Sequence, residues 1–264
     1  MSIKGKRIAL TGGAGGIGML VAKEFLERDA DVLVVDRVRP LSLNARYLIG
    51  DLSTMEGISA VAAELVQEQP DILINLAGIQ FFGPMEQETS AHLHAGYMVN
   101  LIAPVALTQA VLPAMKYWGS GQIVNIGSVF GAINYPHFTT YSSAKAGLRG
   151  FSEALRRELH GSSVTVTYVA PRAVRTGLNG GKVMRFAEMT KMTMDEPESV
   201  ALKIVQATID RKKDVVIGFR ERVFIRVNAL APRLVDAAIA ADTTKARSLF
   251  TPRKPQEVYP CRFC

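Results

Sequence analysis

The sequence predicts a single α/β domain built on a doubly wound parallel sheet with helices on both faces. Short apolar segments rich in β-branched residues alternate with longer segments whose apolar residues recur at helical spacing. No linker or internal repeat interrupts this alternation before about residue 242. Such an order favours parallel strands joined by right-handed helical crossovers, which cover both faces of a sheet. The 264 residues are sufficient for one large domain with a substantial core.

The first part of the chain supplies three strands and two helices. RIALTG at 7–12 has the apolar character of a buried strand, and apolar residues at helical spacing predict a helix at 18–29. DVLVVD at 31–36 is β-branched and ends in an acid, so we predict the second strand there. A shorter strand at 46–52 is followed by a helical pattern at 57–69.

The same alternation continues in the second part of the chain. DILINLAG at 71–78 is a buried strand closed by glycine, and a long helix is predicted at 90–115, followed by the strand QIVNIGS at 122–128. The remaining predicted elements are a helix that contains Tyr141 and Lys145 and ends near residue 159, a strand at 164–171, a helix at 197–211 and a strand at 214–219.

Composition and charge exclude several classes of protein. An apolar content of 48% and a charged content of 21% are those of an ordinary globular protein, and we expect no apolar run as long as the ~18 residues of a membrane span. The net charge of +7 comes from the end of the chain, because residues 1–210 carry 19 Lys and Arg against 19 Asp and Glu, and residues 211–264 carry 12 against 5. A neutral main body without zinc spacing or aromatic-basic interleaving predicts no binding of nucleic acid.

The cysteines and histidines predict neither a disulfide framework nor a metal site. Cys261 and Cys264 are the only cysteines and form one C-x-x-C in a proline-containing segment without a second pair. His92 and His94 flank one residue, so on a helix they point to different faces, and we interpret them as solvated surface histidines. The first residues do not have the pattern of a signal peptide, and we expect a cytoplasmic protein.

A glycine-rich turn follows the first predicted strand. TGGAGGIG at 11–18 leaves a strand and enters a helix, which is the context that makes such a string meaningful. Its register is ambiguous: one dinucleotide-type spacing uses Gly13, Gly15 and Gly18, and a longer loop uses Gly12, Gly16 and Gly18. In either register, glycines let the backbone approach a pyrophosphate, and the helix N-terminus supplies free N–H groups.

An acid stands where a ribose would be recognised. Asp36 ends the second predicted strand, eighteen residues beyond Gly18, where a carboxylate can accept hydrogen bonds from ribose hydroxyls. A 2′-phosphate would meet like charge at this position, so we expect NAD(H) to be preferred. NADP(H) stays open, because Arg37 or Arg39 could turn towards a phosphate.

A phenol and an ammonium lie one helical turn apart. Tyr141 and Lys145 share a helix face among small neighbours in TTYSSAKAGL, 139–148. Hydride transfer to or from a carbonyl carbon requires a proton to move at the oxygen, and a free tyrosine with a pKa of ~10 is a poor base. An ammonium at ~4 Å in an effective dielectric of ~20 stabilises a phenolate by about 4 kcal/mol, enough to lower the pKa by ~2–3 units.

These motifs together resemble the short-chain dehydrogenase/reductase family over roughly residues 3–219. The longer glycine register, with Thr11 before it, is the family's own, and the resemblance implies a Rossmann-type fold. It also implies a catalytic tetrad, which in this sequence is Asn100, Ser128, Tyr141 and Lys145. The cofactor contacts predicted from the motifs and the resemblance are Gly12, Ala14, Gly15, Gly16, Ile17, Gly18, Asp36, Asp51, Leu52, Asn75, Ala77, Gly78, Tyr141, Lys145, Pro171, Val174 and Thr176.

The resemblance also implies a role for each part of the site. Ser128 would hydrogen-bond the substrate oxygen, and Asn100 would hold a water that passes protons towards Lys145. Asp51 and Leu52 match the family's adenine-contacting pair. The segment from Asn75 to Gly78 matches one that steadies the central sheet, and 171–176 matches the segment beside the nicotinamide.

Two residues depart from the family's pattern. Leu76 stands where a second asparagine is frequent, which is a mild change on the sheet side. Arg172 stands where glycine usually follows the proline, which would place a positive charge near the substrate.

We therefore predict an oxidoreductase that interconverts a secondary alcohol and a ketone as a homodimer or homotetramer, with Tyr141 as general acid and base. The alternative is a non-catalytic dinucleotide-binding sensor or scaffold on the same fold. The segment 176–196 is the expected substrate lid. Its apolar residues, which favour a sizeable apolar or lipid-like substrate but fit a helix packed on the body equally well, are Met184, Phe186, Met189, Met192 and Met194.

The chain after the last predicted strand forms an extension. We place the catalytic domain in 1–219, a helical extension of the same domain in 220–241 and a basic tail in 242–264. Pro232 should kink the extension or begin a second helix. The helical apolar stripe consists of Val223, Val227, Leu230, Leu234 and Ala241, beside Arg220, Arg222, Arg226 and Arg233. We expect this stripe to pack on the body or on another subunit, and peripheral contact with an anionic membrane or an acyl-carrying partner is the alternative.

Overall fold

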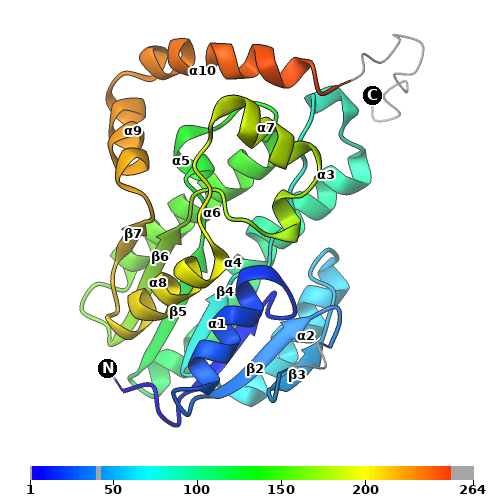
Figure 1. Ribbon diagram of the computed structural model, residues 1–264. Coiled ribbons are helices and arrows are strands. Elements are labelled where there is room, and N and C mark those ends of the chain that lie inside the picture. Colours follow the sequence, from blue (N-terminus) through cyan, green and yellow to red (C-terminus); the bar gives the residue numbers. More distant parts are fainter. Residues whose placement is uncertain (1, 40–42, 251–264) are drawn as a thin grey trace, which may run out of the picture.

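A computed structural model describes residues 2–39 and 43–250 and confirms the predicted doubly wound α/β fold (Figure 1). Seven parallel strands form one sheet in the order β3-β2-β1-β4-β5-β6-β7. The strands are β1 (Arg7–Thr11), β2 (Asp31–Asp36), β3 (Arg46–Ile49), β4 (Ile72–Asn75), β5 (Gly121–Ile126), β6 (Val164–Ala170) and β7 (Asp214–Val216). Because β1 lies between β2 and β4, the strand order reverses there and opens a crevice at the carboxyl ends of these strands.

Helices cover both faces of the sheet (Figure 1). The helices of the body are α1 (Gly16–Leu26), α2 (Met55–Glu68), α3 (Ser90–Tyr97), α4 (Ala103–Tyr117), α6 (Thr139–Glu158) and α8 (Pro197–Ile209). Successive residues of a strand point to opposite faces, so Leu10 packs in one core with α1 and α8, while Ala9 packs in a second core with α2, α4 and α6. The alternation expected from the sequence thus produces two separate cores around one sheet.

The helix starts follow from local chemistry. The side chain of Thr54 accepts a hydrogen bond from the Gly57 N–H at 3.0 Å and caps α2. Pro197 and Pro232 occupy the first turns of α8 and α10, where a missing N–H costs nothing. Several predicted strands extend too far, for instance 71–78 against Ile72–Asn75, because the apolar run continues beyond the sheet into residues that line a cavity.

The long helix predicted at 90–115 is one helical stretch with an irregular centre. A π-helical segment (Met98–Ile102) separates α3 from α4. Pro104 carries no N–H, so the carbonyl of Asn100 cannot receive the usual bond from four residues ahead. The stretch Ser90–Tyr117 is apolar enough, by length and composition, to cross a membrane, contrary to our expectation, because Lys116 near its end is its only Lys, Arg, Asp or Glu. Half of its most apolar window is buried inside the fold, as in a core helix.

Four further helices build a third core beside the sheet. They are α5 (Phe130–Ile133), α7 (Lys182–Thr190), α9 (Phe219–Leu230) and α10 (Pro232–Arg247), and short 3₁₀ turns lie at Met85–Gln87 and Gly177–Asn179. Figure 1 shows α10 lying across α5 and α7 at the end of the molecule away from the sheet. Val235 and Ala246 of α10 are buried there together with Phe138 and Phe186.

In the C-terminal extension, the apolar residues that pack against the body are mostly not those of the predicted stripe. Pro232 begins a second helix, one of the two predicted alternatives, and that helix continues to Arg247, beyond the expected boundary at 241. The inward residues are Phe224, Ile225 and Val235, whereas Val223, Leu230 and Leu234 of the predicted stripe are 45%, 87% and 65% exposed. Only Val227 of that stripe packs in the third core. Helical spacing identified an apolar stripe but not which side of the helix faces the body.

Candidate active site

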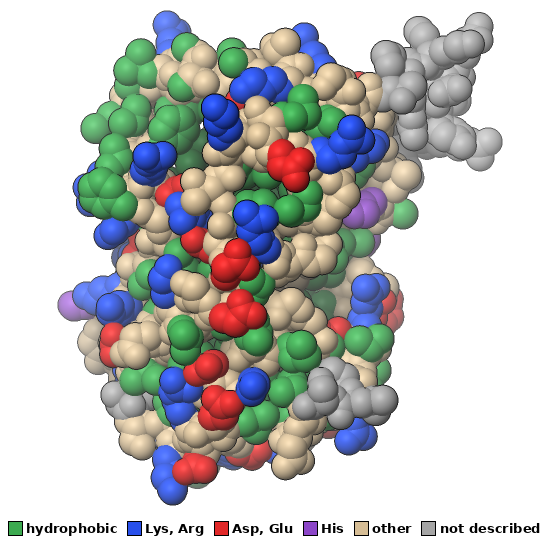
Figure 2. Space-filling model, in the orientation of Figure 1, with side chains coloured by type: hydrophobic (Ala, Val, Ile, Leu, Met, Phe, Trp, Pro, Cys, Tyr) green, Lys and Arg blue, Asp and Glu red, His purple; other side chains and the backbone are tan. Residues whose placement is uncertain are grey.

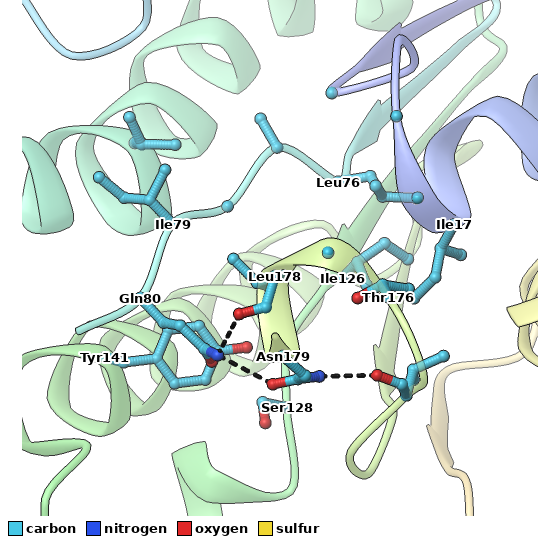
Figure 3. A pocket seen from close by; sticks show the side chains of 18 of the residues that line it. Ile17, Leu76, Ile79, Gln80, Ile126, Ser128, Tyr141, Thr176, Leu178 and Asn179 are labelled. Atoms are coloured by element: carbon cyan, nitrogen blue, oxygen red, sulfur yellow. Dashed lines mark hydrogen bonds between the residues drawn. The ribbon is translucent and has the colours of Figure 1, made fainter. Parts of the chain in front are cut away.

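A cavity of about 750 Å³ opens at the carboxyl ends of the central strands (Figure 3). The glycine turn after β1, Asp36 at the end of β2, the loop after β4, Ser128 after β5 and the segment after β6 contribute to its walls. Of the predicted cofactor contacts, all but Gly18 and Asn75 line this cavity. The sequence motifs, although they are spread over 165 positions from Gly12 to Thr176, therefore converge on one place.

The glycine turn adopts the longer of the two registers. Gly12 and Gly16 have positive φ angles of 74° and 49°, which favour glycine. A Cβ on Gly12 would lie 2.6 Å from the Cα of Ala77, and a Cβ on Gly18 would lie 2.0 Å from the carbonyl oxygen of Gly12. Gly18 thus lets α1 pack closely under the turn and does not itself reach the cavity. Gly15 caps α1 without a side-chain bond, so the first N–H groups of the helix are free to face an anion in the cavity.

Asp36 lies at the end of the cavity formed by β2. Its Oδ2 accepts a hydrogen bond from the N–H of Ala14 at 2.9 Å, and its Oδ1 accepts one from the N–H of Arg37 at 2.7 Å. The carboxylate is therefore fixed beside the glycine turn. Arg37 also lines the cavity, while the guanidinium of Arg39 lies over the ring of Tyr47, 5.1 Å from its centroid.

Asp51 and Leu52 form the neighbouring wall. Asp51 Oδ1 accepts a hydrogen bond from the Ser53 N–H at 2.9 Å, and this bond, helped by the charge of Arg37, holds the pKa of the carboxyl below its usual range. Leu52 is buried and offers an apolar surface. The pair has the shape of a wall against which a flat, apolar ring could pack.

Asn75, one of the predicted cofactor contacts, is not among the residues that line the cavity and bonds to buried polar groups of the body. Its Nδ2 donates to Asn125 Oδ1 at 2.8 Å, and Asn125 Nδ2 donates to Ser152 Oγ at 2.8 Å. This buried chain of polar groups ties β4 and β5 to α6. The hydroxyl of Thr11 accepts bonds from the N–H groups of Leu76 and Ala77, which positions the cavity wall after β4.

Ser128, Tyr141 and Lys145 meet at the floor of the cavity. Ser128 follows β5, and its Oγ accepts a bond from the Phe130 N–H at 3.1 Å. Burial raises the pKa of Tyr141, contrary to the lowering expected from Lys145, and a hydrogen bond with the Ser128 side chain acts in the opposite direction to burial. Lys145 Nζ donates to the Ile126 carbonyl at 2.9 Å and lies 5.9 Å from the Tyr141 ring centroid. Burial lowers the pKa of Lys145 to about 8.

Asn100 is fully buried behind the cavity wall and does not line the cavity. Its Nδ2 donates to the carbonyls of Ile79 and Gly96 at 2.7 and 2.8 Å, while its Oδ1 is buried and has no partner among the described residues. A Cβ on Gly78 would lie 3.1 Å from that oxygen and 3.8 Å from Lys145 Nζ. Gly78 therefore leaves room between the two polar atoms, where a bridging water would satisfy Asn100.

Arg172 does not present a free charge to the cavity, although it is one of the lining residues. Its guanidinium pairs with Asp195 Oδ1 at 2.6 Å and with Glu221 Oε1 at 3.4 Å. The positive charge expected near the substrate is thus neutralised by two carboxylates. Through these two ion pairs, Arg172 links the segment after β6 to Asp195 at the end of the predicted lid and to Glu221 of α9.

An amide bridge that the sequence did not reveal ties the predicted lid to the loop after β4. Gln80 Nε2 donates to the carbonyl of Leu178 and to Asn179 Oδ1, both at 2.8 Å, and Asn179 Nδ2 donates to the carbonyl of Val174 at 2.8 Å. Figure 3 shows this bridge close to Tyr141 and Ser128. Gln80 and Asn179 are 99 positions apart, so no local pattern could indicate their contact.

The wall on the substrate side is mostly apolar. Met192 is the one member of the predicted lid set that lines the cavity, whereas Phe186 is buried in the third core and Met189 is 40% exposed. The other lining residues on this side, which sequence reasoning missed, are Ile79, Gln80, His92, Ala95, Val99, Phe130, Phe138, Leu178, Asn179 and Val183.

His92 corrects our interpretation of a solvated surface histidine. It lines the cavity, and its Nδ1 lies 2.9 Å from Oε1 of Glu88, whose other oxygen accepts a bond from Thr140 beside Tyr141. In the described part of the chain, no group of three or more His, Cys, Asp or Glu residues could hold a metal ion. Cys261 and Cys264 lie outside the described residues.

The residues present fit a dinucleotide. Gly12 and Gly16 have no side chains to block a phosphate, the N-terminus of α1 supplies N–H donors, and Asp36 supplies a fixed acceptor at one end. At the other end, the cavity reaches the buried Tyr141 and Lys145 pair. A cavity lined by a fixed carboxylate, a glycine turn and a buried phenol beside an ammonium is suited to a nicotinamide dinucleotide.

Comparison with known proteins agrees with this geometry. The family model described as "short chain dehydrogenase" matches residues 6–184. The ketoacyl reductase HetN from Nostoc sp. is 28% identical over 255 residues, which cover 89% of this chain and 88% of HetN.

Two solved structures share the fold. A short-chain dehydrogenase from Burkholderia cenocepacia, in complex with NADP, has a TM-score of 0.75 at 22% identity and covers 96% of this chain and 100% of its own. A 4-hydroxyisoleucine dehydrogenase complexed with NADH has a TM-score of 0.73 at 27% identity and covers 80% of this chain and 96% of its own. The chain described here belongs to the short-chain dehydrogenase/reductase family and is an oxidoreductase that binds a nicotinamide dinucleotide.

Proposed function

We propose that this oxidoreductase interconverts a secondary alcohol and a ketone with a largely apolar body, and that it prefers NAD(H). The observation that carries the proposal is the convergence of Ser128, Tyr141 and Lys145 on the floor of a cavity whose opposite end is closed by Asp36. When bound, the nicotinamide ring supplies or accepts the hydride.

Tyr141 moves the proton at the substrate oxygen. Burial raises its pKa, so the phenol is protonated at neutral pH and is ready to donate to the oxygen of a ketone. The ammonium of Lys145 then stabilises the phenolate that remains. With Lys145 Nζ 5.9 Å from the centroid of the Tyr141 ring and an effective dielectric of ~20, this stabilisation is about 3 kcal/mol.

Ser128 and Asn100 support that proton transfer. The Ser128 hydroxyl, which already bonds Tyr141, orients the substrate oxygen and stabilises its developing negative charge. The unpartnered Oδ1 of Asn100 holds a water next to Lys145, which gives the proton a route away from the buried pair.

The composition of the cavity supports an apolar substrate. Phe130, Phe138, Val183 and Met192 line the region beyond Tyr141, and Arg172 is already paired there. The part of the substrate bound in this region should therefore be aliphatic or aromatic, and binding should not require it to be negatively charged. The polar residues on this side of the cavity include Gln80, His92 and Asn179, and Gln80 is already bonded to the segment at Leu178 and Asn179.

The test is to measure the oxidation of NADH, from the decrease in its absorbance, with a panel of aliphatic and aromatic ketones. Tyr141→Phe should still bind NADH but lose kcat by about 10²–10⁴, as is typical when a general acid is removed. Near-normal turnover in this variant would contradict the mechanism. NADH binding without turnover of any ketone by the unsubstituted protein would favour the sensor or scaffold.

We further propose that the protein works in the cytoplasm as a homodimer or homotetramer, as members of this family commonly associate. The absence of cysteines among the first 260 residues supports a reducing compartment. Light scattering after size-exclusion chromatography gives the mass directly, and a monomer at micromolar concentration contradicts the assembly.

A further inference from the structure

The outward side of α9 carries three large apolar side chains that are exposed to solvent. Phe219, Val223 and Leu230 are 73%, 45% and 87% exposed, and with Arg226 they recur at positions i, i+4, i+7 and i+11 of the helix. This spacing places all four on one side of the helix. The residues that face the body, Phe224 among them, belong to the third core and lie on the other side.

Arginines interleave with these apolar residues and lack acidic partners. Arg222 lies over the ring of Phe219, 5.6 Å from its centroid, and Arg220, Arg226 and Arg233 form no ion pair within residues 2–39 and 43–250. Figure 2 shows green hydrophobic and blue basic side chains mixed over the part of the surface that α9 occupies. We call the surface of Phe219, Val223, Leu230, Arg222 and Arg226 the α9 surface.

The acids of this region are turned away from the α9 surface. Residues 219–247 contain six Lys and Arg against three Asp and Glu. Glu221 pairs with Arg172 of the cavity wall, and Asp242 accepts a bond from the Tyr135 hydroxyl at 2.7 Å. Two of the three negative charges are thus used inside the fold, which leaves the outside strongly positive.

We propose that the α9 surface binds an anionic lipid membrane, with Phe219 and Leu230 inserted at the boundary of headgroups and acyl chains. A short helix with an apolar outer side flanked by arginines is the form that lies in the plane of such an interface. Each arginine near an anionic bilayer contributes about 1 kcal/mol, or roughly fivefold in partitioning. The inward side of α9 remains packed on the body, so binding requires no unfolding.

Charge decides against the other occupants. A second copy of this chain, related by a twofold axis through the α9 surface, would bring arginines against arginines. The tail at 251–264 carries Arg253, Lys254 and Arg262 against Glu257 and has the same sign as the surface. An anionic nucleic acid matches the charge but offers no apolar layer for Phe219 and Leu230.

Flotation of the full chain with vesicles tests the proposal. The protein should float with vesicles of phosphatidylcholine mixed with phosphatidylglycerol, should do so less at high salt, and should not float with phosphatidylcholine alone. Replacing Phe219 and Leu230 together by alanine should weaken binding at least about tenfold, because two exposed apolar side chains lose their insertion. Arg222→Gln with Arg226→Gln should weaken it about 25-fold.

Matched variants keep the experiment specific. Tyr117 and Trp118, at the C-terminal end of α4, are 82% and 64% exposed, and their replacement by alanine removes similar apolar area elsewhere and should leave flotation unchanged. Lys203→Gln with Lys212→Gln removes two exposed charges that lie outside α9 and should weaken flotation less than the arginine pair. A chain that ends at Phe250 should bind as the full chain does. Thermal melts confirm that each variant is folded.

Three results would overturn the proposal. The first is no flotation of the unsubstituted protein with phosphatidylglycerol vesicles at low salt. The second is a loss of binding on alanine substitution of Tyr117 and Trp118 that equals the loss on alanine substitution of Phe219 and Leu230. Binding that depends on the arginines but not on Phe219 and Leu230 counts equally against the proposal, because it is expected for a purely electrostatic partner such as nucleic acid. The third is dissociation of an oligomer by Phe219→Ala with Leu230→Ala, which would make the α9 surface a subunit contact.

Discussion

Lys145 couples the proton chemistry of the site to its burial. The side chain is 3% exposed, and its Nζ donates to the Ile126 carbonyl alone among the described residues. Removing an ammonium from water disfavours its charge, which is why the pKa falls to about 8. Burial moves the pKa of Tyr141 the other way, upward from its ordinary value. Across the neutral range the pair is therefore a neutral phenol beside an ammonium.

This arrangement predicts a loss of ketone reduction at alkaline pH. The ammonium is present below pH 8 and is lost as the pH rises through that value, so kcat/KM should fall above about pH 8. The fall cannot come from Tyr141, whose pKa lies above its ordinary value of about 10. Lys145→Arg keeps a charge at all these pH values and should move the fall to higher pH, whatever its effect on kcat. A pH–rate profile that stays flat to about pH 10 contradicts this account.

Asp36 predicts the choice of cofactor. The carboxylate is fixed by the N–H groups of Ala14 and Arg37, so it cannot turn away from a 2′-phosphate. Asp36→Asn keeps an acceptor for Ala14 and removes the charge, and it should shift the ratio of kcat/KM values towards NADPH by about tenfold, the effect of ~1.4 kcal/mol of repulsion. Arg37→Gln should shift the same ratio in the opposite direction. An unsubstituted protein that prefers NADPH would show that Arg37 outweighs the acid.

At the scale of elements, the sequence predicted what is local to a strand end. The turn after β1, Asp36 after β2 and Ser128 after β5 each follow an apolar run, and parallel strands bring their carboxyl ends to one edge. The helix of Tyr141 and Lys145 was predictable because four-residue spacing is intrinsic to a helix. Each of these sequence motifs depends only on residues that are neighbours in the chain. The order of the strands in the sheet is the one further fact needed to bring them together.

Contacts between distant segments left no such signal. Gln80 reaches the lid across 98 positions, Arg172 reaches Glu221 across 49, and His92 faces the cavity only because α3 packs beside α6. The helix α9 has two apolar stripes, one with Val223 and Leu230 and one with Phe224 and Ile225. Which of them faces inward depends on the packing of α9 against α5 and α10. Periodicity describes a helix by itself, whereas these features depend on what the helix or loop packs against.

The amide bridge of Gln80 predicts the behaviour of the lid. Its two hydrogen bonds to Leu178 and Asn179 contribute about 1 kcal/mol each, so Gln80→Ala should raise the open fraction of the lid by about tenfold or more. Tryptic cleavage at Lys182 and Arg185 should accelerate by a similar factor, and KM should change more than the stability of the whole fold.

Gln206→Ala is the matched control for the lid. Gln206 donates only to Asp210 at the exposed end of α8, so its loss removes an amide hydrogen bond without touching the lid. Equal cleavage rates in both variants would show that the Gln80 bridge does not hold the lid closed.

At the scale of the whole molecule, the C-terminal helices form part of the core around the site. The third core joins α5, α7, α9 and α10, and it includes Phe138 and Tyr141, both of which border the cavity. Two polar contacts reinforce it, from Tyr135 to Asp242 at 2.7 Å and from Asn228 Nδ2 to the Ala132 carbonyl at 2.8 Å. One side of α9 thus closes the fold while the other side is free for a membrane.

Deletion of residues 220–264 should therefore destabilise the protein and expose apolar surface. The loss of Val235 and of the half-buried Phe224, Ile225 and Ile239 amounts to about 5 kcal/mol of burial, which lowers Tm by about 10–20 °C in a domain of this size. The exposed Phe138 and Phe186 should bind an apolar dye. A chain that ends at Phe250 keeps every one of these contacts and should melt as the full chain does. The chain without residues 220–264 and the chain that ends at Phe250 would have the same Tm and the same ketone turnover if the burial of the C-terminal helices contributed nothing to stability. That result would show that these helices do not support the part of the fold that holds Tyr141.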